Sequence, residues 1–195
     1  MSSIPQLMFL IAILVCAGAT NMAFVKSFGS APLRPIDGGI LLSDGKRLFG
    51  DNKTWMGFFG MIAITAIWLA TAGWLATNFP AIDRLSLIRF EELNSPFNVW
   101  FFGALWGLAY VLAELPNSYL KRRIDILPGR NGEGLTGRLF LVLDQADSVI
   151  GCVIVMPLFC SITWWDAVAL VVLGSFVHYL TNLGLFAVRL KNQAG

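Results

Sequence analysis

Charged side chains are scarce in this sequence: Asp, Glu, Lys and Arg make up only 13% of its 195 residues. A soluble domain usually carries about 25% of such residues. Hydrophobic residues reach 56%, and the mean hydropathy is +0.69. This balance excludes an ordinary soluble fold, a disordered chain and a basic arm that binds nucleic acid. It indicates a polytopic membrane protein with no nucleic-acid partner.

Cysteine and histidine are also rare. The three cysteines, Cys16, Cys152 and Cys160, all lie in apolar runs, and the only histidine is His178. No spacing among these residues resembles the ligand pattern of a zinc site. We therefore expect the cysteines to be small core residues, because a free thiol packs like a small hydrophobic side chain.

Five apolar runs are long enough to cross a membrane, since about 20 helical residues span a hydrocarbon core. They are residues 7–25, 56–77, 97–115, 139–162 and 167–188. Residues 1–6 contain no Lys or Arg, so we expect a retained first helix rather than a secretory signal peptide. The sequence predicts an all-α, polytopic bundle of five transmembrane helices in one catalytic domain, 1–195.

The positive charges fall mainly on one side of this bundle. Twelve of the 14 Lys and Arg residues lie in the first loop, the third loop and the C-terminal tail, whereas Arg84 and Arg89 lie in the second loop. The positive-inside rule assigns the richer side to the cytoplasm. We predict an integral protein of the cell membrane with its N-terminus outside, its C-terminus inside, and two cytoplasmic loops, 26–55 and 116–138. The twelve residues are Lys26, Arg34, Lys46, Arg47, Lys53, Lys121, Arg122, Arg123, Arg130, Arg138, Arg189 and Lys191.

Two carboxylates lie within a segment predicted to span the membrane, where a charged group is energetically unfavourable. Asp144 and Asp147 fall inside the fourth apolar run, and an acidic residue within a membrane is by default a candidate functional residue. Their spacing places both on one face of a helix. Counted from Leu139 at 1.5 Å per residue, Asp144 lies only about 8 Å deep. This depth favours a water-accessible pocket.

Polar residues follow helical spacing on two other runs as well. The three polar faces are predicted to line one cavity that opens to the cytoplasm. The alternative is that they hold the bundle together through hydrogen bonds between helices. The residues are Tyr110, Glu114, Asn117, Ser118 and Lys121 on the third helix, and Ser175, His178, Thr181 and Asn182 on the fifth.

The first loop combines glycine with cationic, acidic and hydroxyl residues. Glycine lets backbone N–H groups approach an anion closely, and hard oxygen ligands suit magnesium. The mixture predicts a site for magnesium-bound phosphates, whereas a purely topological role would need only the positive charges. The residues concerned are Gly45, Lys46, Arg47, Gly50, Asp51, Lys53, Thr54 and Gly57.

Four motifs follow one another along the chain. They are Gly-Asp-Asn-Lys-Thr-Trp-x-Gly (50–57), Ser-x-x-Lys-Arg-Arg (118–123), Leu-Asp-Gln-x-Asp (143–147) and His-x-x-x-Asn (178–182). In this order they resemble the motifs of the CDP-archaeol synthase family of integral-membrane cytidylyltransferases. Each is weak alone, but four in order over most of the chain are specific. The family usually carries Arg after the Trp of the first motif, where this chain has Met56, so a phosphate contact is not expected at that position.

The resemblance implies an enzyme that transfers CMP from CTP to a lipid phosphate, with Mg²⁺ as cofactor, releasing pyrophosphate and a CDP-lipid. Its partners would be CTP, an archaeal-type or other glycerol-lipid phosphate, and the surrounding membrane lipids. For such a reaction, the residue types lead us to assign Asp144, Asp147 and Asp51 to the metal, and Asp144, Asp147 and Lys121 to catalysis. The residues that we expect to bind substrate are Asp51, Asn52, Lys53, Thr54, Asn117, Ser118, Arg122, Arg123, His178 and Asn182.

Two other functions compete with this interpretation. A CDP-alcohol phosphotransferase needs an Asp-Gly-x-x-Ala-Arg signature, but residues 44–49 read Asp-Gly-Lys-Arg-Leu-Phe. An ion-coupled transporter could use Asp144, Asp147 and His178 as a relay. The chain has no internal repeat and its charged loops favour one face, which disfavours a transporter. A Gly-x-x-x-Gly motif at 103–107 would also suit a homodimer.

Overall fold

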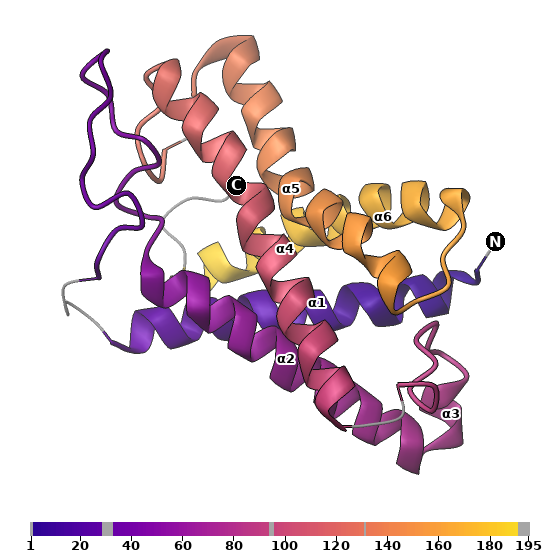
Figure 1. The fold of residues 1–195 in the computed structure, drawn as a ribbon. Coiled ribbons are helices and arrows are strands. Elements are labelled where there is room, and N and C mark those ends of the chain that lie inside the picture. Colours follow the sequence, from indigo (N-terminus) through magenta and orange to yellow (C-terminus); the bar gives the residue numbers. More distant parts are fainter. Residues whose placement is uncertain (1, 29–32, 94–95, 131, 191–195) are drawn as a thin grey trace.

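The computed structural model describes residues 2–28, 33–93, 96–130 and 132–190, with the side chains of 96 and 97 left out, so Lys191 lies outside the described residues. The regular secondary structure of that part is helical, apart from two isolated β-bridges, and loops join the helices (Figure 1). Five helices there are long and apolar enough to cross a membrane, as the sequence predicts. The elements are α1 (Ile4–Ser27), α2 (Trp55–Asn78), α3 (Pro80–Asp83), α4 (Pro96–Arg123), α5 (Gly134–Val155), the 3₁₀ helix η1 (Met156–Leu158) and α6 (Trp164–Ala187).

Side-chain caps fix where two of these helices begin. Thr54 precedes α2, and its hydroxyl accepts a hydrogen bond from the backbone N–H of Gly57 at 3.2 Å. Thr163 precedes α6 and exchanges hydrogen bonds with Asp166, which is a capping box. The predicted substrate-binding residue Thr54 therefore has a structural role at the start of α2.

Two helices extend further than the apolar runs indicate. The third run ends at residue 115, but α4 continues through Pro116 to Arg123. The fourth run starts at residue 139, but α5 begins at Gly134. Hydropathy marks the part of a helix that suits hydrocarbon, whereas backbone hydrogen bonds continue into polar residues beyond it. The predicted loop 116–138 is thus reduced to residues 124–133.

The chain crosses from one side of the bundle to the other with each long helix. On one side, the backbone N–H of Ser2 donates to Asp166 at 2.7 Å, which joins the start of α1 to the start of α6. On the other side, the Lys26 ammonium donates to the Arg189 carbonyl, which joins their ends. The loops after α1 and α4 lie on this second side. The alternation agrees with the five predicted spans.

Glycines bring α4 into backbone contact with both of its neighbours. A Cβ on Gly103 would lie 2.6 Å from the Cα of Ala66 in α2, and one on Gly107 would lie 2.7 Å from the Met61 carbonyl oxygen. On α5, a Cβ on Gly151 would lie 2.6 Å from the carbonyl oxygen of Ala109 in α4. The Gly-x-x-x-Gly face is therefore occupied by α2, so a homodimer would have to use another face.

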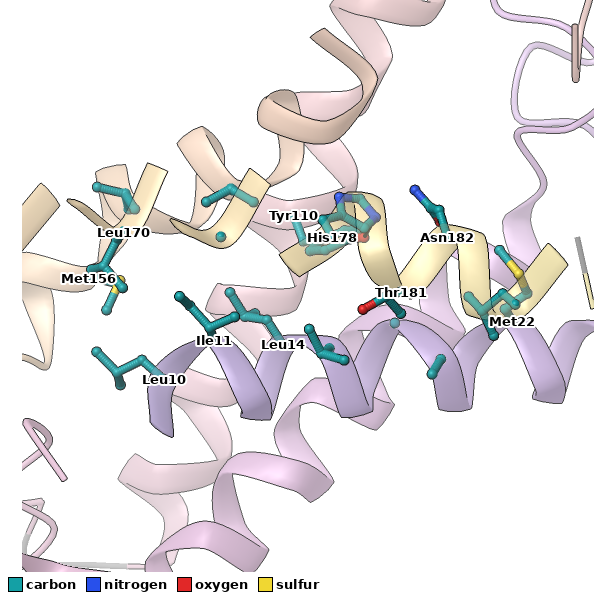
Figure 2. A pocket seen from close by; sticks show the side chains of 17 residues that line it. Leu10, Ile11, Leu14, Met22, Tyr110, Met156, Leu170, His178, Thr181 and Asn182 are labelled. Carbon is teal, nitrogen blue, oxygen red and sulfur yellow. Dashed lines mark hydrogen bonds between the residues drawn. The ribbon is translucent and has the colours of Figure 1, made fainter. Parts of the chain in front are cut away.

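A groove lies between α1 and α6 and is also lined by residues of α5 and α4 (Figure 2). Most of its wall is aliphatic, and its polar side chains come from Tyr110, His178, Thr181 and Asn182. We refer to it below as the α1–α6 groove. Its lining residues are Leu10, Ile11, Leu14, Val15, Gly18, Ala19, Met22, Tyr110, Val149, Val153, Met156, Leu170, Gly174, His178, Thr181, Asn182 and Leu185.

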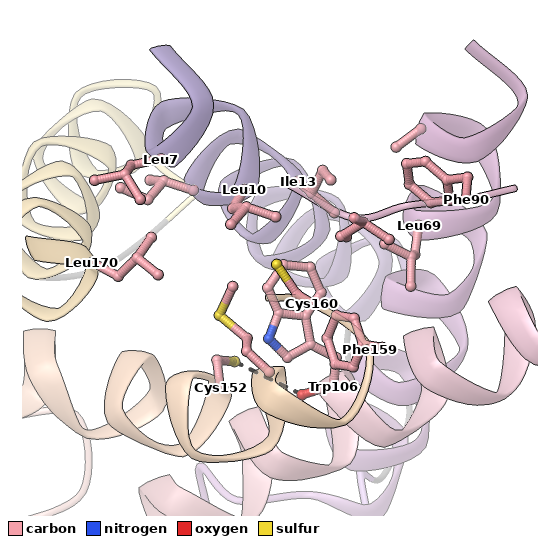
Figure 3. Close-up of a cluster of buried hydrophobic side chains, with 14 of the residues drawn as sticks. Leu7, Leu10, Ile13, Leu69, Phe90, Trp106, Cys152, Phe159, Cys160 and Leu170 are labelled. Carbon is pink, nitrogen blue, oxygen red and sulfur yellow. Dashed lines mark hydrogen bonds between the residues drawn. The ribbon is translucent and has the colours of Figure 1, made fainter. Parts of the chain in front are cut away.

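The main core lies beside this groove, around Trp106 of α4 (Figure 3). The Trp106 ring is fully buried and makes an edge-to-face contact with Phe159, at 5.6 Å between ring centroids. Cys152 and Cys160 are buried in the same cluster and carry free thiols. Both are small core residues, as the sequence predicts.

Candidate active site

The two intramembrane aspartates of α5 face two polar residues of α4. The side-chain amide nitrogen of Asn117 donates to Asp144 and to Asp147, at 2.7 Å in each case. The Lys121 ammonium donates to both carboxylate oxygens of Asp144, at 2.7 and 2.5 Å. We call these four residues the acid–lysine cluster. The predicted polar faces of the third and fourth spans therefore do meet.

The cluster is shielded from solvent but not closed. The Lys121 and Asp144 side chains are 12% and 24% exposed. Charges in such surroundings attract one another more strongly than in water, so the pair holds both side chains in place. Within the described part of the chain, the buried Oδ1 atom of Asn117 has no hydrogen-bond partner. It remains available to a ligand.

The donor set of the cluster fits a magnesium ion. One nitrogen atom of Asn117 reaches both carboxylates, so a single cation near that position could reach them too. Mg²⁺ is commonly bound through one or two carboxylates, with waters and substrate phosphates as its other ligands. Among the residues that the structure describes, no group of three or more His, Cys, Asp or Glu side chains converges. The carboxylates that the cluster offers to a cation are those of Asp144 and Asp147.

A second ion pair lies beside the cluster. Lys53, directly before the cap of α2, is paired with Glu114 inside α4, and both side chains are largely buried. Burial alone would lower the pKa of Lys53, but the negative charge of Glu114 raises it, with smaller contributions from Asp147 and Asp144. The ammonium is therefore held in its charged form next to the aspartates. Sequence reasoning placed Glu114 on a polar face but did not include it in the site.

The loop 33–54 is organised around the buried carboxylate of Asp37. Arg47 donates to both of its oxygens, at 2.6 and 3.3 Å, and the backbone N–H groups of Phe49 and Gly50 donate at 3.0 and 2.9 Å. Burial would raise the pKa of Asp37, but these donors hold it well below its usual range. Arg47 also pairs with the exposed Asp51 at 2.7 Å. The structure does not bring Asp51 to Asp144 and Asp147, contrary to its predicted share in the metal site.

The same loop is fastened to the end of α4. Arg123 donates to Asp44 at 2.5 Å and also to the Arg47 carbonyl, while Lys46 donates to the Arg123 carbonyl and to Asp125, at 2.8 Å in each case. Arg123, which the sequence predicts to bind substrate, thus contacts the loop with its guanidinium. The basic residues at the end of α4 therefore have different contacts: Lys121 contacts Asp144, whereas Arg123 contacts the loop.

Arg122 differs from both of its neighbours. Its side chain is buried, and its Nε atom donates weakly to the Ser118 carbonyl at 3.4 Å. Its Nη1 atom has no hydrogen-bond partner among the described residues. A buried guanidinium with an unused donor is suited to a phosphate oxygen. Ser118 is buried one residue after Asn117, whereas Asn52 lies exposed in a turn of the loop 33–54.

Two polar residues of α6 contact Gln145, the residue next to Asp144 in α5. Asn182 donates to the Gln145 side-chain oxygen at 2.7 Å, and His178 Nδ1 lies 3.3 Å from the Gln145 carbonyl oxygen. The other ring nitrogen of His178 lies 3.5 Å from the Tyr110 hydroxyl. Gln145 directly follows Asp144 in α5. Sequence reasoning missed Gln145, although it stands inside the Leu-Asp-Gln-x-Asp motif.

Comparison with known proteins gives the family of the chain. A family model described as CarS-like, CDP-archaeol synthase, matches residues 3–194. The CDP-archaeol synthase of Thermofilum pendens is 34% identical over 161 residues, covering 82% of this chain and 65% of that protein. This chain therefore spans slightly less than two thirds of that relative's length. The CDP-archaeol synthase of Methanoculleus marisnigri is 32% identical, covering 76% of this chain and 82% of that protein.

A solved structure has the same fold. It is described as an intramembrane enzyme for archaeal membrane lipids biosynthesis, and it matches this chain with a TM-score of 0.59 and 24% sequence identity. The match covers 87% of this chain and 90% of that chain. Together with the five spanning helices, the likeness supports a multi-pass integral membrane protein.

Proposed function

Because the chain belongs to the CDP-archaeol synthase family, we propose that it is a magnesium-dependent cytidylyltransferase, which transfers CMP from CTP to the phosphate of a membrane lipid. The acid–lysine cluster carries this proposal, because it places two carboxylates and an ammonium group at the end of α4 that meets the loop 33–54. On this proposal CTP arrives from the cytoplasm, which we assign to the side of that loop. The N-terminus then lies outside and the C-terminus inside.

The reaction joins two phosphates. An oxygen of the lipid phosphate attacks the α-phosphorus of CTP, and the bond from that phosphorus to the oxygen bridging the β-phosphate breaks. Pyrophosphate leaves with the electron pair of that bond, and the product is a CDP-lipid. Such transfers depend on positioning and charge neutralisation more than on covalent chemistry by the protein.

The residues of the site divide this work. Asp144 and Asp147 would hold Mg²⁺, which when bound supplies positive charge to the phosphate oxygens. Asn117 keeps the two carboxylates at a fixed separation by donating to both. Lys121 and Lys53 are each already ordered by a carboxylate, so little conformational entropy is lost when they turn to phosphate oxygens. Arg122 offers its unpartnered Nη1 to a phosphate oxygen.

The direct test is to incubate the purified protein in detergent with labelled CTP, Mg²⁺ and a panel of ether-linked and ester-linked lipid phosphates. We expect one acceptor class to yield a CDP-lipid and pyrophosphate in equal amounts, and excess chelator to stop the reaction. A transporter would need a sealed vesicle and would leave CTP intact in detergent. Failure to consume CTP with every acceptor, in the presence of Mg²⁺, would overturn the proposal.

A further inference from the structure

The α1–α6 groove lies outside the charged chemistry described above. Figure 2 shows it running along both helices, with Leu10, Met156 and Leu170 at one end and Met22 and Asn182 at the other. From Leu170 to Asn182, α6 rises by about 18 Å at 1.5 Å per residue. The groove therefore follows more than half of the thickness of a hydrocarbon core of about 30 Å.

One half of the groove is purely apolar, and the other half is joined to the acid–lysine cluster through Gln145 of α5. Asn182 and His178 line the groove and contact Gln145, at 2.7 Å and 3.3 Å respectively. Gln145 is adjacent to Asp144 in the chain. A molecule lying in the groove would thus have one end close to the charged cluster and the other among aliphatic side chains.

We propose that the α1–α6 groove holds one hydrocarbon chain of the lipid phosphate acceptor while its phosphate lies at the acid–lysine cluster. This inference rests on the proposed function. It commits to this occupant because an amphiphile with an anionic head needs a cationic site and an apolar surface that are continuous with each other. An ordinary bilayer lipid needs only the apolar part.

The groove contributes orientation and selection more than affinity. Inside a bilayer, lipid tails are as apolar as the groove wall, so moving a chain into the groove gains little from the hydrophobic effect. What the wall offers is close packing, which depends on the shape of the chain. Chain shape should therefore decide which acceptors place their phosphate correctly.

Gly18 offers the cleanest way to narrow the groove. Among the described residues, a Cβ at this position would meet the Tyr110 hydroxyl alone, at an ordinary contact distance of 3.6 Å. The first atom of a side chain can therefore be added there without a backbone clash. By contrast, a Cβ on Gly174 would lie 2.8 Å from the side chain of Val149, so α5 and α6 would have to move apart. Ala12 provides a matched control, because it lies on α1 but is exposed outside the groove.

The test compares Gly18→Leu and Gly18→Phe with Ala12→Phe and wild type. We expect the KM for a long-chain lipid phosphate to rise at least about tenfold in the Gly18 variants, as for other small volume changes in apolar pockets. The increase should be larger for Gly18→Phe than for Gly18→Leu. Turnover of a short-chain, detergent-dispersed lipid phosphate should change little, and so should the increase in melting temperature given by CTP with Mg²⁺. If Gly18→Phe has the same KM and turnover as Ala12→Phe for both the long-chain and the short-chain lipid phosphate, the proposal is wrong.

A binding readout separates this inference from the proposed function. A lipid phosphate with a photoreactive group in its chain should label peptides spanning residues 10–22 and 170–185, and an unlabelled lipid phosphate should compete. If labelling occurs there but wild type makes no CDP-lipid, the proposed function fails and the groove assignment holds. If a photoreactive neutral lipid labels these peptides equally well, the groove holds ordinary bilayer lipid and the inference is wrong.

Discussion

Lys53 and Glu114 form a largely buried ion pair that ties the end of the loop 33–54 to the third membrane-spanning helix. Two charges in such a position stabilise each other, and removing one leaves the other buried without compensation. The pair also places an ammonium group next to Asp147 and Asp144. Its disruption should therefore affect substrate binding as well as stability.

Glu114→Gln should move the alkaline limb of the pH–activity profile to lower pH. Glu114 raises the pKa of Lys53, so the stabilisation from this pair is fully present below the unfolded pKa of lysine, about 10.4, and is lost as pH rises through the higher folded pKa. Without Glu114, burial lowers the pKa, and Lys53 loses its proton earlier. The measurement is CMP transfer against pH. Glu92→Gln, which loses only the exposed pair with Arg89, should keep the wild-type profile.

Asp147→Asn should abolish CMP transfer without unfolding the protein. The amide keeps the shape of the side chain and removes a hard anionic ligand that Mg²⁺ needs. Asp144→Asn should be equally inactive but less well ordered, since it also removes the partner of Lys121. Thermal unfolding with and without CTP and Mg²⁺ provides the readout. We expect the wild type alone to be stabilised, and near-normal turnover in both variants would refute the metal-site assignment.

Arg122→Met should weaken CTP use while leaving the melting temperature unchanged or higher. The substitution nearly preserves volume and removes a buried guanidinium whose Nη1 has no partner in the described part of the chain. A hydrogen bond to a charged group contributes about 1.5–3 kcal/mol, so KM for CTP should rise roughly 10- to 100-fold. Arg130→Met, at an exposed position, is the control. Loss of stability without a change in KM would assign Arg122 a structural role instead.

Asp37→Asn should loosen the loop 33–54 at neutral pH. The pKa of Asp37 is depressed in the folded state, so its stabilisation is present above the unfolded pKa of about 4 and is lost as pH falls through the folded pKa. The protection factors of the loop amides, which correct for the pH dependence of intrinsic exchange, should therefore be high in wild type at pH 7 and lower at strongly acidic pH. The variant should show low protection factors at both. Asp83→Asn, on the other side of the bundle, should behave as wild type.

Thiol labelling of intact cells can check the assigned orientation. Arg89→Cys lies in the second loop and should react with a membrane-impermeant reagent added outside. Lys46→Cys should react only after the cells are opened. The basis is the partition of 12 Lys and Arg residues to one side and two to the other. If Lys46→Cys reacts in intact cells and Arg89→Cys does not, the assigned orientation is wrong and the opposite one is correct.

The sequence was sufficient for features that depend on spacing within one helix. Asp144 and Asp147 share a face because they are three residues apart, and Asn117 and Lys121 share one because they are four apart. These two pairs can face each other as long as their helices are neighbours. Spacing along the sequence does not predict contacts between residues of other elements that are far apart in the chain. The contact of Arg123 with Asp44, 79 residues away, is an example, because nothing local in the sequence indicates it.

The loop residues show the same limit. Asp51 and Lys53 are two positions apart and were assigned neighbouring roles. In the folded loop, Asp51 turns outward to Arg47, whereas Lys53 turns inward to Glu114. A loop without helical or strand periodicity leaves the direction of each side chain to its tertiary contacts, which here depend on the buried carboxylate of Asp37.

The glycine contacts of α4 also bear on how the protein can diverge. At Gly103, Gly107 and Gly151 an added methyl group would meet backbone atoms, so α2, α4 and α5 tolerate few substitutions where they meet. At Gly18, by contrast, an added methyl group would meet, among the described residues, one side-chain atom, the Tyr110 hydroxyl, at ordinary contact distance. Mutational drift, or a library made in the laboratory, should therefore accumulate viable changes on the surface of α1 that lines the groove. New acceptor preferences could then arise by changing this surface, while the helices that hold the catalytic charges keep their packing.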